Sequence, residues 1–133
     1  MQPEVAEHHV QLAAARLRAA AATGDVALLQ GAVEAALWMR ERWPDDWRSH
    51  ALVGDVLNNA GETERALEAY RRCSDLAPRS IARCEIKIAR TLLALGRHEE
   101  AAALLIEVFG EEPEASQAAE LLAVARRPAK ARE

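Results

Sequence analysis

Aromatic residues are scarce in this sequence, and the long apolar runs that mark a membrane protein are missing. Only 4% of the 133 residues are aromatic, although half of the chain is apolar. No run of about 18 apolar residues occurs, so the sequence predicts no membrane span. The first residues, MQPEVAEHHV, lack the basic and apolar regions of a signal peptide. Because alanine is abundant, we expect helices that pack closely within one domain.

Residue patterns that carry catalysis or bind a metal ion are also lacking. The four histidines are scattered and form no zinc-type spacing with the two cysteines. No glycine-rich phosphate loop occurs, and no serine stands in a nucleophile motif. We therefore predict a protein that is not an enzyme and that binds neither a cofactor nor a metal ion.

Charges of both signs are mixed along the chain. The formal net charge is −4, and 29% of the residues are charged, which argues against general affinity for nucleic acids or membrane surfaces. Cys73 and Cys84 lie on successive predicted helices. We expect Cys73 to pack as a small reduced apolar side chain rather than in a disulfide, with a cytoplasmic location as the consequence. The alanine- and arginine-rich composition suggests a bacterial, GC-rich genome.

Residues 47–80 are the most informative stretch, because they predict a helical hairpin. Two segments have apolar residues at helical spacing, which are Val53, Val56, Leu57 and Ala60 in the first and Ala66, Leu67, Tyr70 and Cys73 in the second. Gly61 separates the segments, since glycine readily takes the left-handed conformation that ends a helix. Pro78 ends the second segment. Neither helix can bury its apolar face alone, so the hairpin needs neighbours.

The same pattern recurs at one constant offset along the chain. The corresponding pairs are Gly61 and Gly96, Ala66 and Ala101, Pro78 and Pro113, Leu57 and Leu92, Tyr70 and Leu105, and Cys73 and Val108. Self-similarity of this length indicates a stacked repeat. Gly54, Ala66 and Cys73 are predicted to lie where the helices approach closely.

The stretch resembles a tetratricopeptide repeat. His50 stands where the family usually has Trp, and the remaining offsets are matched by Val53-Gly54, Leu57, Ala66, Tyr70 and Pro78. The resemblance implies an all-α solenoid of about three helix–turn–helix repeats in a single domain, residues 1–127. The repeats are expected at 3–46, which is divergent, at 47–80 and at 81–113, with a capping helix at 114–127 and a disordered tail at 128–133.

The first two helices are expected at about 3–22 and 26–43. Their inward residues are predicted to be Val5, Val10, Ala14, Leu17 and Ala21, followed by Leu29, Ala32, Val33, Ala36, Leu37 and Met39. Asp25 and Asp45 are predicted caps of the second and third helices. Gly31 within the second helix suggests a close helix contact. Among the tryptophans, Trp38 and Trp47 are expected to be packed and Trp43 to be partly exposed, as a contact for a partner or a second copy.

The resemblance also implies a concave groove, lined by the first helix of each repeat. Carrying over the family's offsets places Arg48, Ala51, Asp55, Asn58 and Asn59 in the groove, together with Arg83, Ile86, Lys87, Arg90 and Leu93. Arg83, Lys87 and Arg90 are spaced by helical turns and form one basic stripe. They suit an acidic or amphipathic peptide, because arginine pairs in a two-pronged way with carboxylates.

Three other interpretations are open. The charged stripe could be an ordinary solvated face. The chain could be an assembly protein that forms a homodimer or filament through its N-terminal hairpin and Trp43. It could also be a non-catalytic subunit that docks an enzyme. A clamp for chaperone C-termini is disfavoured, because Leu52 stands where that clamp has Asn.

Overall fold

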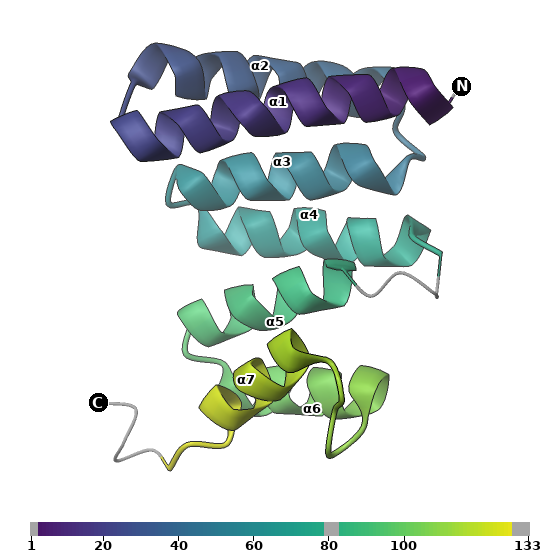
Figure 1. Ribbon diagram of the computed structural model, residues 1–133, viewed down its shortest axis with the longest axis vertical. Helices are drawn as coiled ribbons and strands as arrows, with labels where there is room; N and C mark the ends of the chain where they lie inside the picture. Colours follow the sequence, from purple (N-terminus) through teal and green to yellow (C-terminus); the bar gives the residue numbers. More distant parts are fainter. Residues whose placement is uncertain (1–2, 79–82, 129–133) are drawn as a thin grey trace. The chain divides into compact units, whose positions relative to one another are not determined.

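A computed structural model describes residues 3–78 and 83–128, and all regular structure in these ranges is helical. The helices are α1 (Pro3–Thr23), α2 (Val26–Arg42), α3 (Trp47–Asn59), α4 (Thr63–Leu76), α5 (Arg83–Ala94), α6 (His98–Phe109) and α7 (Ser116–Ala125) (Figure 1). The all-α prediction is therefore confirmed. The chain forms two compact units, Met1–Pro78 and Arg79–Glu133. No described helix is long and apolar enough to cross a membrane.

In the first unit α1 and α2 form a hairpin, α3 packs against both of them, and α4 packs against α3 (Figure 1). Its buried cluster draws on the first three helices and consists of Ala13, Ala32, Ala36, Met39, Leu52, Val53 and Val56. Three of these residues are alanines, which have no side chain beyond Cβ. Close packing of alanine-rich helices, expected from the composition, therefore contributes to this core.

The turns after α3 and α5 have the same construction. Gly61 and Gly96 have φ angles of 82° and 76°, in the left-handed region that favours glycine. In the first turn the Glu62 N–H donates to the Leu57 carbonyl at 2.8 Å, and in the second the Arg97 N–H donates to the Leu92 carbonyl at 2.8 Å. The predicted helix ends at both glycines are therefore confirmed. The structure adds that the two turns are closed by equivalent hydrogen bonds.

Gly54 is the point of closest approach between α3 and α4. A Cβ atom added there would lie 2.9 Å from Tyr70 Cζ and closer to two other atoms of the ring. Tyr70 is buried, and its hydroxyl donates to Asp55 Oδ1 at 2.6 Å. The predicted close contact at Gly54 is confirmed. The same prediction for Gly31 is wrong, because a Cβ added there would meet nothing within 4 Å.

The cap of α3 also differs from the prediction. Asp46, not Asp45, is the N-cap, and its Oδ1 accepts a hydrogen bond from the backbone N–H of Arg48 at 3.0 Å. Asp46 has an extended backbone, which holds its side chain over the first turn, whereas the side chain of Asp45 is 89% exposed. Asp25 caps α2 as predicted and accepts the Ala27 N–H at 2.9 Å.

The inward faces of α1 and α2 agree with the prediction only in part. Val10, Leu17 and Val33 pack against the buried cluster as predicted, whereas other positions differ. In α1 the buried residues are Ala13 and Ala20, while Val10, Ala14 and Leu17 are half-buried and Ala21 is exposed. The side chain of Val5 lies outside the described residues. In α2, Leu37 and Trp38 were expected to face inward, yet they are 45% and 47% exposed.

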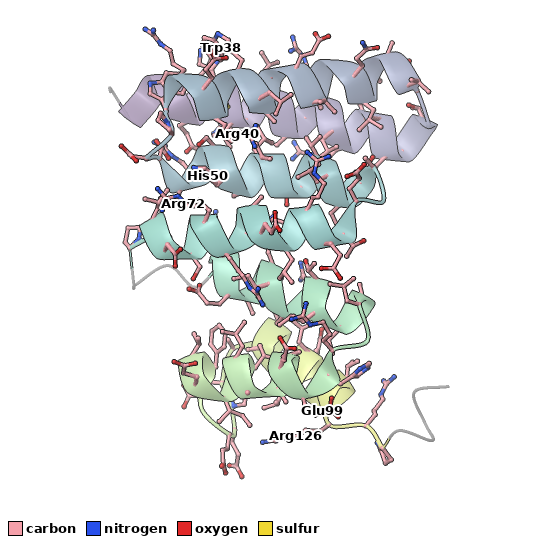
Figure 2. All side chains as sticks on the ribbon, turned by 180° about the vertical axis from the view of Figure 1, so that it is seen from behind. Trp38, Arg40, His50, Arg72, Glu99 and Arg126 are labelled. Atoms are coloured by element: carbon pink, nitrogen blue, oxygen red, sulfur yellow. The ribbon has the colours of Figure 1, made fainter. Side chains whose placement is uncertain are left out.

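The exposure of Trp38 follows from the neighbours of α2. Helix α2 packs against α1 on one side and α3 on the other, and it meets them through Ala32, Ala36 and Met39. This arrangement leaves Trp38 on the side of the α1–α2 hairpin that faces away from α3 (Figure 2). Amphipathic spacing alone cannot place a residue when a helix has two packed sides.

In the second unit, α7 packs against both α5 and α6. The buried cluster contains Ala89 from α5, Leu105 from α6, and Ala118 and Leu122 from α7. Helix α7 thus covers the hairpin as its predicted cap, although it spans Ser116–Ala125 rather than 114–127. Val108 is 41% exposed, while Cys73, its counterpart in the repeat comparison, is fully buried. Positions 79–82 and 129–133, which include a predicted repeat boundary and most of the predicted tail, lie outside the described residues.

The cysteines overturn one prediction. Cys73 and Cys84 are each fully buried, as expected of small apolar side chains, but both are disulfide-bonded rather than reduced. No free cysteine occurs among the described residues. Burial could be inferred from helix position, but the oxidation state could not. The cytoplasmic location loses the support that reduced cysteines would have given it.

Candidate functional site

The basic stripe of α5 lines an open pocket of about 710 Å³ in the second unit. Arg83, Ile86, Lys87 and Arg90 form the wall on α5, and the rest is built from Phe109, Ala115, Ser116 and Gln117. Four of the five groove residues predicted from α5 are therefore brought together in one place. Leu93, the remaining α5 residue of the predicted groove, is half-buried and does not line the pocket.

The spacing within α5 explains why the stripe faces outward. The opposite face of the helix holds Cys84, Ile88, Ala89 and Leu92, all of which are buried. Residues three and four positions apart share a face, so Arg83, Lys87 and Arg90 are directed away from that core. Ile86 lies within the same stretch and is half-buried, which adds an apolar element to a basic wall.

The far wall comes from the connection between α6 and α7. Phe109 is the last residue of α6, and Gly110 then turns the chain with a φ of 84°. Ala115 is the N-cap of α7 and provides no side-chain hydrogen bond to the helix. The first turn of α7 therefore presents backbone N–H groups beside the pocket, where the helix dipole favours negative charge.

The pocket is positively charged although the whole protein carries a net charge of −4. Three basic side chains line it, and no aspartate or glutamate is among its lining residues. Arg83 and Arg90 are both exposed, and neither forms an ion pair with another residue of the described ranges. Grouping like charges costs energy through repulsion, and an anionic ligand would relieve that cost.

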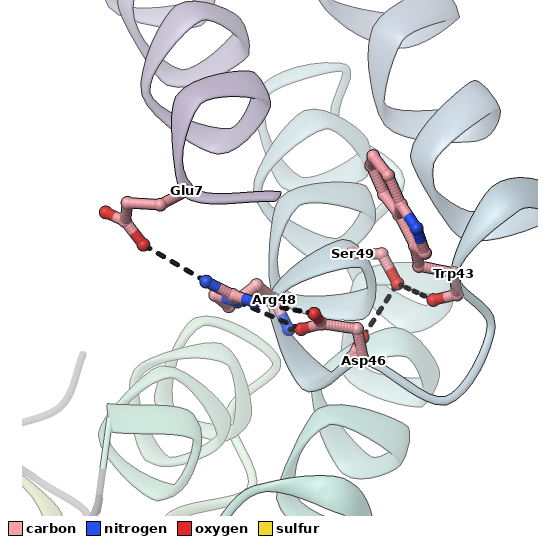
Figure 3. Close-up of polar contacts among 5 residues, drawn as sticks. All are labelled: Glu7, Trp43, Asp46, Arg48 and Ser49. Carbon is pink, nitrogen blue, oxygen red and sulfur yellow. Dashed lines mark hydrogen bonds and ion pairs between the residues drawn. The ribbon is translucent and has the colours of Figure 1, made fainter. Parts of the chain in front are cut away.

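Arg48, predicted as a groove residue of the first unit, is held by acidic neighbours (Figure 3). Its Nη2 lies 2.7 Å from Asp46 Oδ2, and its Nη1 lies 3.3 Å from Glu7 Oε2. Its Nε also donates to Asp46 Oδ1 at 3.0 Å. Arg48 thus ties the start of α3 to α1, and its charge is compensated within the molecule.

The titration behaviour of this pair fits a structural role. Burial alone raises the pKa of Asp46, but hydrogen bonds from the Arg48 side chain and backbone outweigh it, so that the pKa is lowered overall. The hydrogen bond to Asp46 raises the pKa of Arg48 in turn. Ser49 reinforces the turn, because its hydroxyl donates to the carbonyl groups of Trp43 and Asp46 at 3.0 and 2.8 Å.

The other predicted groove residues of the first unit lie on α3. Asp55 accepts the Tyr70 hydroxyl and so supports the α3–α4 contact. Ala51 is half-buried, and Asn58 and Asn59 are exposed in the last turn of the helix. Asp55, Asn58 and Asn59 line none of the three pockets that contain Trp43, Trp38 and His50 in the described part of the first unit.

Three aromatic rings form a cluster at one end of the α1–α2 hairpin. The ring centroids of His9 and Trp38 are 4.9 Å apart, those of His9 and Trp43 5.6 Å, and those of Trp38 and Trp43 5.5 Å. Trp43 is half-buried against the core, in agreement with the predicted partial exposure. Trp38 is the more exposed of the two, contrary to prediction. Trp47 is half-buried.

Sequence reasoning missed Phe109 and the start of α7 as parts of the pocket. A signal was present for Phe109, since it is the only Phe of the chain and stands shortly before Pro113. Within the described ranges, no group of three or more His, Cys, Asp or Glu residues could hold a metal ion. Comparison with models of known protein families gave no match, and comparison with curated proteins gave none either.

Proposed function

We propose that the protein is a tetratricopeptide-like interaction module without catalytic activity, which binds an acidic or amphipathic peptide segment of another protein. The observation that carries the proposal is the pocket on α5, where Arg83, Lys87 and Arg90 meet the apolar side chains of Ile86 and Phe109. The equivalent turns at Gly61 and Gly96, with their matching hydrogen bonds, support a repeat of the tetratricopeptide kind and hence an α-solenoid.

The chemistry of the pocket suits a peptide that carries both carboxylates and an apolar residue. Each arginine can hold a carboxylate with two parallel hydrogen bonds, which gives orientation as well as attraction. Phe109 and Ile86 can bury an apolar side chain next to those charges, and burial of apolar surface adds affinity that salt does not screen. We therefore expect binding that weakens at high salt but does not disappear.

The test is a binding titration with the full chain and a fluorescently labelled peptide of glutamates around one leucine. The matched control peptide has glutamines in place of the glutamates. The protein variant is Arg83→Gln/Arg90→Gln, which removes two charges and keeps much of the side-chain bulk. Its control is Arg16→Gln/Arg18→Gln, which removes the same charge from exposed positions on α1.

The wild type and the α1 control should bind the glutamate peptide equally well. The pocket variant should bind it roughly tenfold more weakly, as expected for two partly exposed charge pairs. The glutamine peptide should bind weakly to all three proteins. Equal affinity of the pocket variant and the wild type would refute the assignment of the pocket as the peptide site.

A second candidate function is assembly through the N-terminal hairpin, either with a second copy or with an enzyme that the chain docks. The observation that favours it is the exposure of Trp38 at 47% beside Leu37 at 45%. Large exposed aromatic residues are frequent anchors of protein interfaces. In this alternative, Trp38 and Trp43 supply the contact, and replacement of Trp38 by alanine is the change that would weaken it.

A further inference from the structure

The segment that joins α6 to α7 carries three carboxylates within a short stretch, on Glu111, Glu112 and Glu114. All three residues are exposed. None of them forms an ion pair with another residue of the described ranges. The guanidinium of Arg126 lies beside the segment, but it donates to the Glu111 carbonyl, at 3.2 Å, and not to a carboxylate.

This acidic segment ends where the pocket begins. Glu114 is followed directly by Ala115, which lines the pocket together with Arg83 and Arg90. The two arginines are likewise without an ion-pair partner among the residues that the structure describes. One patch of the second unit thus joins an acidic segment to a pocket that is lined by arginines. Such a patch is self-complementary, because a two-fold rotation brings the acidic part of one copy onto the basic part of the other.

We propose that the acidic segment 111–114 of one molecule occupies the α5 pocket of a second copy, and reciprocally, so that the protein forms a two-fold dimer through this patch. The inference rests on the proposed function and names the chain's own acidic segment as a ligand of the pocket. Ile86 and Phe109 supply apolar surface at the pocket, and Pro113 restricts the backbone of the segment. A segment with fewer free conformations loses less entropy when it binds.

Dimer formation of this kind also regulates the pocket. Each dimer closes two pockets at once, so an acidic partner must displace the segment of the second copy before it can bind. A glutamate-rich peptide should therefore convert dimer to monomer as it binds. High salt should weaken the dimer, since the charge pairs lie at a solvent-exposed patch.

The experiment is sedimentation velocity on the full chain over a wide concentration range, at low and at high salt. Variant one, Arg83→Glu/Arg90→Glu, makes the pocket acidic. Variant two, Glu112→Arg/Glu114→Arg, makes the segment basic. A control, Arg16→Glu/Arg18→Glu, makes the same charge change as variant one on exposed positions of α1. Circular dichroism confirms that each protein is folded before it is analysed.

The wild type and the control should dimerise with the same dissociation constant. Variant one and variant two should each be monomeric, or should form dimers with a dissociation constant roughly a hundredfold higher than that of the wild type. The reason is that several exposed charge pairs across the dimer contact become repulsive at once. An equimolar mixture of the two variants should restore dimers, since the acidic pocket of one then meets the basic segment of the other. Restoration in the mixture is specific to this reciprocal contact.

Three results would overturn the inference. They are a wild type that stays monomeric throughout, a dimer that both variants retain, and a mixture of the variants that remains monomeric. A dimer that is retained in both variants but lost in Trp38→Ala would transfer self-association to the N-terminal hairpin. If the wild type is monomeric yet binds the glutamate peptide through Arg83 and Arg90, the proposed function stands and only the self-association is refuted.

Discussion

The contact between Gly54 and Tyr70 allows a prediction in which one substitution has opposite effects at two sites. Gly54 and Gly31 both lie inside helices, and replacement by alanine removes the same backbone freedom at each. At Gly54 the new methyl group would overlap the Tyr70 ring. At Gly31 it would meet nothing within 4 Å. At Gly31 the substitution therefore only improves helix propensity, which stabilises the protein. At Gly54 the same gain is opposed by a steric clash.

The magnitude follows from how firmly Tyr70 is held. The residue is 3% exposed, and its hydroxyl is fixed by the hydrogen bond to Asp55, so the ring cannot swing into solvent. Overpacking of a filled core costs about 1–3 kcal/mol, while the change from glycine to alanine within a helix returns about 1 kcal/mol. The net effect is the clash minus the propensity gain, so we expect Gly54→Ala to lower the free energy of unfolding by up to about 2 kcal/mol. For a chain of this length, that corresponds to a fall in Tm of up to about 7 °C.

Urea and thermal denaturation, followed by far-UV circular dichroism, measure this difference. Gly31→Ala should raise the free energy of unfolding by up to about 1 kcal/mol. In a Tyr70→Leu background, Gly54→Ala should no longer destabilise the protein, because the ring that it meets is gone. If Gly54→Ala stabilised the wild-type protein as much as Gly31→Ala does, the close approach of α3 and α4 at Gly54 would be refuted.

Two further predictions concern Asp46 and the cysteines. Hydrogen bonds from Arg48 outweigh burial and lower the pKa of Asp46 in the folded protein. The charged carboxylate therefore stabilises the fold at pH values above 3.8, the ordinary pKa of this group. This stabilisation is lost as the pH falls through the lower pKa of the folded state. The variant Asp46→Asn keeps an acceptor for the helix cap but removes the charge. It should be less stable than the wild type near neutral pH and equally stable in strong acid, as urea titrations at a series of pH values would show. A stability difference that did not depend on pH would contradict the charge effect. Because Cys73 and Cys84 are disulfide-bonded, a maleimide should label neither in the denatured, unreduced protein and both after reduction, as mass spectrometry would register. Labelling before reduction would contradict the oxidised state.

The features that the sequence predicts well are local ones. Gly61 and Gly96 end helices where the pattern places them, because a left-handed residue after an apolar helical face is a short-range signal. The basic stripe of α5 is predicted equally well, since helical spacing alone puts Arg83, Lys87 and Arg90 on one face. The buried face of α4, with Ala66, Leu67, Tyr70 and Cys73, follows from the same periodicity.

The features that the sequence does not reveal depend on contacts between distant segments. Arg48 has a local partner in Asp46, but its second partner, Glu7, is 41 residues away. Ser116 and Gln117 reach the α5 pocket because α7 folds back over the α5–α6 hairpin. Trp38 is exposed because α2 uses two of its sides for packing, which a single apolar stripe does not describe. In each case the periodicity identifies the helix but not its set of neighbours.

The most direct test of the proposed binding site is to locate a bound acidic peptide on the full chain by nuclear magnetic resonance. The backbone amide signals of the isotope-labelled protein are recorded while the glutamate peptide is added. We predict the largest shifts at Ile86, Phe109 and Gln117, which line the pocket, and little change around Trp38. Shifts concentrated on the α1–α2 hairpin, with the pocket signals unmoved, would contradict the account and place the binding surface on the first unit.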